Sequence, residues 1–157
     1  FSTGDDAEEL VTRPKDLMDT ATPSANSLAA AGLLRLAAHT GEDRYGEHAR
    51  RILGNLGALA SKHALAFGYL LWAVGLHSVE PTEVVVSGER RDLVREVHRR
   101  FTPHTVLAWG ERGDGPLWEG RDEVGADGRA YVCRDRVCAA PSTTSEELRE
   151  QLAGVPL

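Results

Sequence analysis

A chain of 157 residues, with 41% hydrophobic and 27% charged side chains, has the size and composition of one globular domain or two small ones. The net charge is −6 and is shared evenly, because residues 1–80 hold 7 basic and 10 acidic side chains and residues 81–157 hold 11 and 14. Neither half offers the basic surface that nucleic acids or anionic lipids bind, and no apolar run reaches the roughly 18 residues that span a bilayer, so we expect no nucleic-acid partner and no membrane partner.

The first half of the sequence predicts helices that pair as hairpins. Residues 1–23 show no sustained periodicity and contain two prolines, which indicates an extended lead-in. A helix rich in Ala and Leu is expected over residues 28–38, capped by Ser24 or Asn26 and closed near Gly41. A second helix begins near Glu42 and carries one apolar stripe at helical spacing, formed by Tyr45, Ala49, Leu53, Leu56 and Ala60.

A third segment, residues 64–76, is apolar on nearly every side. It is too short to span a membrane and too apolar to lie on a surface, so we expect a helix that is covered on all faces. We therefore expect a partner for the helical portion, either the missing N-terminal part of the same protein or a second copy in a homo-oligomer. Phe1 stands where an initiator Met is expected, which agrees with a native start further upstream.

The second half of the sequence predicts a small α/β unit. A strand over residues 83–87, a helix over residues 90–101 and a strand over residues 105–109 form a βαβ pattern, so the two strands should be parallel with a right-handed crossover. The helix should turn four side chains inward, namely Leu93, Val94, Val97 and Phe101. A long surface loop over residues 110–129 precedes two strands, residues 130–133 and 137–139, around a tight turn, and a last helix follows over residues 145–152. The expected fold class is α+β, with helical hairpins over residues 1–80 and the α/β unit over residues 81–157.

Two stretches of the sequence carry a family resemblance. One is Arg13-Pro-Lys-Asp16 followed by the segment from Asp19 to Ser27, and the other runs from Ala130 to Pro141. In this order and spacing they resemble the C-terminal region of the YyaL-like, spermatogenesis-associated-protein-20-like family, although Ala25 stands where that family usually has Gly. The resemblance implies a larger protein with an N-terminal thioredoxin-like domain and an (α/α)6 toroid similar to N-acylglucosamine 2-epimerases. The three helices would then be the last hairpins of the toroid.

A polar segment just before the first helix is the main candidate for a ligand site. The candidate residues are Arg13, Lys15, Asp19, Ser24, Asn26 and Ser27. They can hydrogen-bond a small polar ligand such as a sugar at the mouth of a toroid, or they can form a capped loop, since caps use the same residue types. No catalytic acid/base pair and no cofactor are identified, so an epimerase-like or glycosidase-like activity is an alternative function only.

The two cysteines, Cys133 and Cys138, form a C-x4-C pair in predicted strands. Across a two-residue turn they would face each other and form a disulfide or lie as adjacent thiols. The sequence shows no signal peptide, so we expect a cytoplasmic location, which favours the reduced form. Zinc would need two further ligands that the sequence does not supply, so no metal is expected. Structural cysteines are favoured, and a role as a dithiol redox partner is a second alternative.

The turn at residues 87–88 and the charged helix after it have ordinary structural explanations. Ser87 and Gly88 follow a strand and precede a helix, but a single glycine without a phosphate-loop motif indicates an ordinary βα turn. The next helix carries Arg91, Arg95 and Arg99 interleaved with Glu89, Asp92 and Glu96, which predicts a solvated, salt-bridged face. The favoured function is the C-terminal structural or interaction portion of a larger thioredoxin-domain protein, in which the α/β tail closes the toroid and docks the thioredoxin-like domain.

Overall fold

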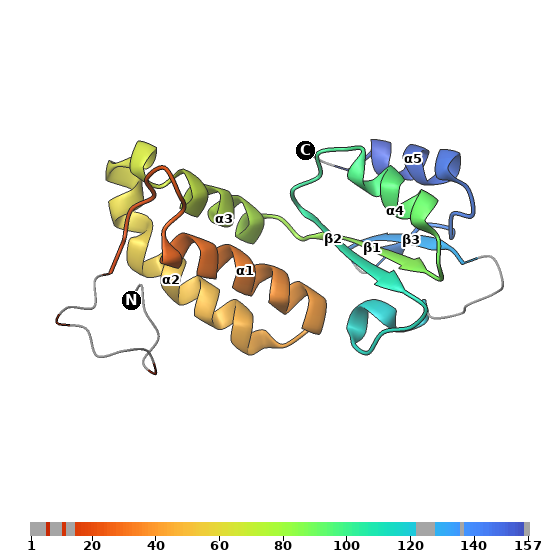
Figure 1. Cartoon of the computed structure of the whole chain (residues 1–157), viewed down its shortest axis with the longest axis horizontal. Coiled ribbons are helices and arrows are strands. Elements are labelled where there is room, and N and C mark those ends of the chain that lie inside the picture. The colour runs from red at the N-terminus through yellow and green to blue at the C-terminus, as the bar shows by residue number, and fades with distance from the viewer. Residues whose placement is uncertain (1–5, 7–10, 12–14, 122–127, 136, 156–157) are drawn as a thin grey trace. The chain divides into compact units, whose positions relative to one another are not determined.

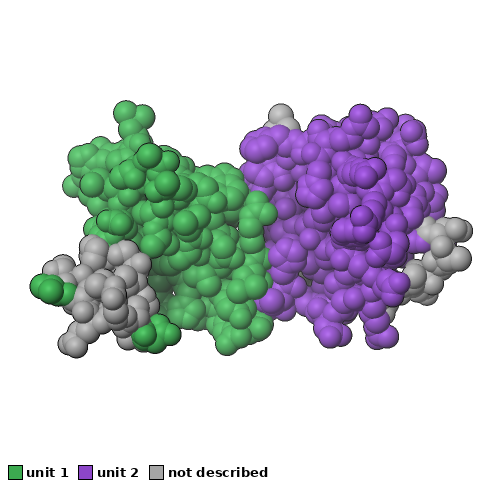
Figure 2. Space-filling model, in the orientation of Figure 1, with its two compact units in different colours: residues 1–37, 42–78 green, residues 38–41, 79–157 purple. Residues whose placement is uncertain are grey.

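The computed structural model describes residues 6, 11, 15–121, 128–135 and 137–155 and has the predicted α+β fold. The chain divides into two compact units, which are coloured separately in Figure 2. Unit 1 consists of residues 1–37 and 42–78, and unit 2 consists of residues 38–41 and 79–157. The sequence places this boundary between residues 80 and 81. Among the described residues, no helix is both long and apolar enough to cross a membrane.

Unit 1 contains the three expected helical segments (Figure 1). Helix α1 spans Ala25–Thr40 and helix α2 spans Asp43–Lys62, followed by the 3-10 turn η1, Ala64–Ala66, and helix α3, Gly68–Ser78. The stripe predicted on α2 is confirmed, because Ala49, Leu53, Leu56 and Ala60 are buried and Tyr45 is half-buried. These side chains pack in one core with Ala30 and Ala31 of α1, Leu70 and Ala73 of α3, and Phe67, which lies between η1 and α3.

The third helical segment differs from its prediction in two ways. Helix α3 begins at Gly68 rather than near Ala64, because the amides of Ala66 and Phe67 bond three residues back and form η1 instead. Its faces are also not all covered by the described chain. Leu70 and Ala73 are fully buried, whereas Leu71 is 42% exposed and Val74 is 37% exposed.

Unit 2 is built on a four-stranded mixed sheet in the order β2-β1-β3-β4. Strands β1, Thr82–Ser87, and β2, Thr105–Gly110, pair in parallel, as the βαβ pattern predicts. Strand β3, Ala130–Arg134, pairs antiparallel with β1 and with β4, Val137–Cys138. The run of valines in the central strand β1 is fully buried, as expected for a strand covered on both faces.

Helices cover one face of this sheet and a 3-10 turn covers the other (Figure 1). Val84 and Val86 point into a core shared with α4, Arg91–His98, and α5, Ser145–Ala153. Val85 points to the opposite face, where Leu117 of the 3-10 turn η2, Pro116–Trp118, packs against it. A capping box fixes the start of α5, since the Thr144 side chain accepts from the Glu147 amide and the Glu147 carboxylate accepts from the Thr144 amide.

Two predictions about α4 are wrong. Phe101 is 76% exposed rather than inward, because α4 ends at His98 and the helical stripe ends with it. Glu96 is not on a solvated face, because the residue is only 4% exposed and binds Arg149 of α5 through two hydrogen bonds of 2.7 and 3.0 Å. This ion pair joins α4 to α5, and the guanidinium of Arg149 lowers the pKa of the Glu96 carboxyl.

The turn from β1 into α4 depends on a glycine. Gly88 has a φ of +75°, and a Cβ added there would lie 3.2 Å from the Cα of Gly128. Ser87 holds the same crossing, because its hydroxyl accepts from the Arg129 amide at 3.0 Å. The close approach of the two backbone segments explains why this βα turn has glycine rather than another residue.

We predict that Gly88→Ala destabilises unit 2 more than Gly120→Ala does. Gly120 has a similar φ of +69° but no described atom within 4 Å of an added Cβ, so its substitution costs only the backbone strain of about 1–2 kcal/mol. The Gly88 variant adds the contact with Gly128. Chemical denaturation of both variants measures the difference, and equal losses of unfolding free energy would show that the close approach does not matter.

Candidate functional site

Asp19, in the lead-in before α1, is the residue around which the polar segment is organised. Its Oδ2 accepts hydrogen bonds from the amides of Tyr69 at 2.8 Å and Leu70 at 3.2 Å. Its Oδ1 accepts from the Ser24 amide at 2.8 Å, and its own amide donates to the Ala66 carbonyl at 2.8 Å. The carboxylate therefore caps the free amides at the start of α3 from 50 residues away in the sequence.

The hydrogen bonds to Asp19 favour its charged form. Burial raises the pKa of the Asp19 carboxyl, but the bonds from the Ser24 amide, the Ser27 hydroxyl and the α3 amides outweigh burial and hold the pKa below its ordinary value. The positive end of the α3 dipole favours the same charge. The carboxylate is thus a structural anion at neutral pH.

The neighbouring candidates also bind the chain itself. The Ser24 hydroxyl accepts from the Ser27 amide at 3.2 Å, and the two hydroxyls lie 3.0 Å apart in a buried position at the start of α1. The Asn26 side chain donates to the Asp16 carbonyl at 3.1 Å. Lys15 is exposed, and Arg13 lies outside the described residues. These contacts are those of a capped loop, and a role in ligand binding stays a prediction.

A shallow open depression of about 440 Å³ on α2 is lined by Glu47, Arg50 and Arg51, far in sequence from the polar segment. Within residues 15–121, 128–135 and 137–155, no cluster of His, Cys, Asp and Glu has the geometry of a metal site. The residues that line the depression do not combine a nucleophile with a base.

Cys133 and Cys138 lie directly opposite each other on β3 and β4 and are joined by a disulfide, with their Cα atoms 3.9 Å apart. Asp135, with a φ of +49°, lies where the sequence predicts a two-residue turn, and the second residue of that turn, Arg136, lies outside the described residues. Facing cysteines can form a disulfide or stay as adjacent thiols. The structure has the disulfide, whereas the sequence analysis favours the reduced thiols.

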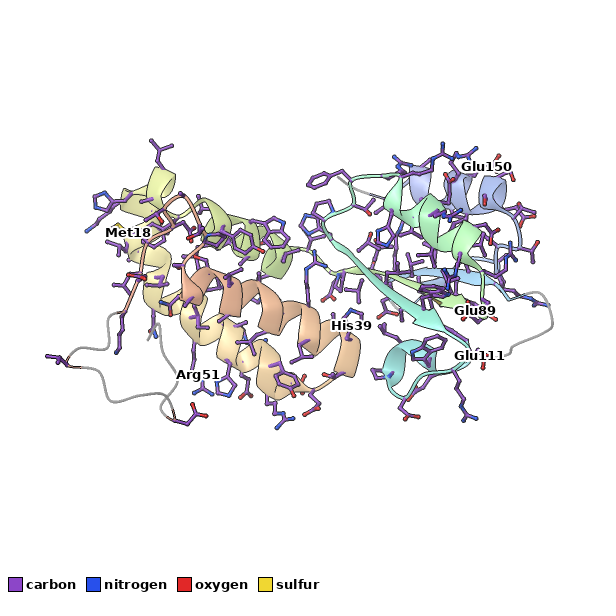
Figure 3. All side chains as sticks on the ribbon, viewed as in Figure 1. Met18, His39, Arg51, Glu89, Glu111 and Glu150 are labelled. Carbon is purple, nitrogen blue, oxygen red and sulfur yellow. A yellow bond between two sulfur atoms is a disulfide. The ribbon has the colours of Figure 1, made fainter. Side chains whose placement is uncertain are left out.

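The exposed faces of α1 and α3 are a feature that the sequence shows only in part. Between residues 25 and 37 the exposed residues of α1 are Ala25, Leu28, Ala29, Gly32 and Leu36. The one charged side chain of this stretch, Arg35, is half-buried, with its guanidinium carbon 5.3 Å from the centre of the Trp72 ring. The exposed residues of α3 are Gly68, Leu71, Val74, His77 and Ser78. Helix α2 is the opposite, because its exposed side carries Asp43, Arg44, Glu47, Arg50, Arg51 and Lys62 (Arg51 is labelled in Figure 3).

Comparison with known proteins confirms the resemblance inferred from the sequence. The chain is 29% identical to human spermatogenesis-associated protein 20 in an alignment 156 positions long that covers 91% of this chain. The chain spans only about 20% of the length of that relative. No family model and no solved structure matches the chain.

We predict that Asp19→Asn destabilises unit 1 by about 2 kcal/mol at neutral pH, because charge-assisted bonds to three amides are weakened. The folded pKa of Asp19 is lowered, so its contribution is present above the unfolded value of about 4 and is lost as the pH falls through the folded value. The difference between wild type and variant should therefore shrink in acid. Denaturation between neutral and strongly acidic pH measures it.

Asp16→Asn is the control, since Asp16 is exposed in the same segment and uses its backbone carbonyl, not its side chain, to bind Asn26. This variant should be as stable as wild type. A loss that is equal in the two variants, or one for Asp19→Asn that does not change with pH, would contradict the capping role.

Proposed function

We propose that this chain is the C-terminal structural portion of a larger protein related to spermatogenesis-associated protein 20, and that unit 1 packs against helices contributed by the rest of that protein. The resemblance covers nearly the whole chain but only a fifth of the relative, which supports a longer parent. The finer assignment, that α1 to α3 are terminal hairpins of an α/α toroid, agrees with their succession as hairpins joined by short turns.

The observation that carries the proposal is the contrast between helices of the same unit. Helix α2 exposes charged side chains to water, as the outer helix of a globular protein does. Helices α1 and α3 expose leucine, valine, alanine and glycine instead. Leu28 is 49% exposed, Leu36 is 39% exposed and Leu71 is 42% exposed. Covering each of these half-exposed side chains would contribute roughly 1 kcal/mol.

The small residues on α1 also indicate what covers it. Leu28, Gly32 and Leu36 follow one another at four-residue spacing, so they form a single ridge along the helix. An added Cβ at Gly32 would meet no described atom within 4 Å, so the described chain leaves this place open. A ridge with a glycine at its centre allows another helix to approach closely, which supports a helical partner surface.

A carbohydrate-binding or other polar-ligand function receives less support. The carboxylate of Asp19 and the hydroxyls of Ser24 and Ser27 are engaged with the chain's own amides and with each other. A ligand would have to displace the cap of α3 to reach them. The polar segment is better explained as the joint that holds the lead-in on α1 and α3.

The test places a glutamate at an exposed alanine of α1 or of α2 and measures stability in the full-length protein and in the 157-residue chain. We predict that Ala29→Glu on α1 lowers the thermal midpoint of the full-length protein by several degrees, because a carboxylate would be buried without a partner. Ala58→Glu on α2 should leave the midpoint unchanged, because Ala58 lies on the charged, exposed side of its helix.

In the isolated 157-residue chain, kept dilute enough to be monomeric, both alanines are exposed, so neither substitution should change stability by more than about 0.5 kcal/mol. Calorimetry of the four proteins gives the comparison. If the two substitutions have the same effect in the full-length protein, the exposed face of α1 is not a packing surface and the proposal fails.

A further inference from the structure

We propose that Cys133 and Cys138 form a reversible thiol–disulfide couple that exchanges two electrons with a dithiol, and that Cys138 is the sulfur attacked. This inference goes beyond the packing role of unit 1 and does not rest on it. The couple differs from the C-x-x-C type, in which the cysteines lie at a helix N-terminus. In unit 2 the residues just before α4 are Gly88, Glu89 and Arg90, and both cysteines lie in strands instead.

The two cysteines differ sharply in their access to solvent. Cys133 is 1% exposed and packs on the sheet face that also holds Val85 and Tyr131. Cys138 is exposed, and its two-residue strand β4 forms an edge of the sheet. Thiol–disulfide exchange requires a thiolate to reach a sulfur atom. An incoming thiolate can therefore reach the bond from the side of Cys138, and Cys133 is the leaving sulfur.

Backbone hydrogen bonds hold the two cysteines opposite each other without the disulfide. Next to the pair, the Ala139 amide donates to the Val132 carbonyl at 2.9 Å. Beyond it, Ala130 and Ser142 exchange two bonds of 2.8 and 2.9 Å. On the turn side, Arg134 pairs with Val137. The reduced thiols therefore stay adjacent, which favours rapid closure of the bond when an oxidant returns.

The connection after β4 is also held by side chains that do not involve sulfur. The Arg134 guanidinium donates to the Gly154 carbonyl at 2.7 Å and to the Gln151 carbonyl at 3.0 Å. The Gln151 amide in turn donates to the Ala140 carbonyl at 2.8 Å. These bonds join the hairpin to α5, so opening the disulfide leaves the hairpin attached to unit 2.

A purely structural bond fits this place less well. The stabilisation that a disulfide gives rises with the length of the loop it closes, and this one joins residues only five apart in the sequence. The hairpin that it crosses is already closed by its own backbone bonds. The bond therefore adds little to stability, while Cys138, which carries one of its sulfurs, is exposed.

A thiolate of the dithiol attacks the Cys138 sulfur, the bond between the two cysteines breaks, and Cys133 leaves as a thiolate that takes a proton from water. The second thiol of the dithiol, deprotonated, attacks its own sulfur in the mixed disulfide and releases Cys138 as a thiolate, which is protonated in turn. The dithiol is oxidised to a disulfide, and the couple gains two electrons and two protons.

The direction of attack is tested with two single variants of the whole chain. Cys133→Ser leaves Cys138 free, and Cys138→Ser leaves Cys133 free. Under native conditions, dithiobis(nitrobenzoate) should modify Cys138 at least ten times faster than Cys133, because the buried thiol reacts only when unit 2 opens. Equal rates, or faster modification of Cys133, would overturn the assignment.

Reversibility is tested on the wild-type chain, which also removes any dependence on how the variants fold. Titration with mixtures of reduced and oxidised dithiothreitol, followed by iodoacetamide and mass measurement, should show one two-electron transition while the far-ultraviolet circular dichroism stays native. Dilution into oxidised dithiothreitol should restore the bond. Reduction that occurs only at denaturant concentrations that unfold unit 2 would make the bond a structural staple and would overturn the proposal.

A parallel arm distinguishes the source of the dithiol. Faster reduction by reduced thioredoxin, recycled by its reductase and NADPH, than by equimolar dithiothreitol supports the couple and assigns the dithiol to a protein. The reverse order supports the couple and assigns it to a small molecule. Failure of both reagents on the native chain overturns it.

Discussion

A helix face without charged side chains is poorly solvated, and this constraint determines how the helical half of the chain has to be understood. Helices α1, α2 and α3 share one core, yet only α2 meets water with a charged surface. The remaining faces of α1 and α3 would leave leucine and valine exposed in isolation. We propose that further parts of a longer protein cover them, since the chain spans only about 20% of the length of the relative that it resembles.

The polar segment before α1 shows how residues typical of a binding site can serve the fold instead. Asp19 caps α3 and closes the turn that leads to Ser24, so one carboxylate connects the lead-in with two helices. The charged Asp19 carboxylate is an effective acceptor because the amides of Ser24, Tyr69 and Leu70 lie at the start of a turn or helix, where the backbone offers them no acceptor. The same residue types would line a sugar site, and only their contacts separate the two interpretations.

Local patterns in the sequence predict the elements well and their long-range contacts poorly. The apolar stripe of α2, the parallel strand pair and the facing cysteines follow from periodicity and turn chemistry. The start of α3 could not be predicted, because it is set by Asp19, 50 residues away. The burial of Glu96 depends on Arg149 from another helix, and the exposure of Phe101 depends on where α4 ends. The uncharged side of α1 was visible in the sequence, whose residues 25–37 contain Arg35 as their one charged side chain.

The central claim, that unit 1 presents apolar helix faces made to be covered, is tested most directly by sedimentation velocity of the isolated 157-residue chain over a range of micromolar concentrations. We expect reversible self-association that grows with concentration, because the faces of α1 and α3 cover one another when their proposed partner is absent. The full-length protein should not associate through these faces. A chain that sediments as a single monomeric species at every concentration would show that these faces need no cover.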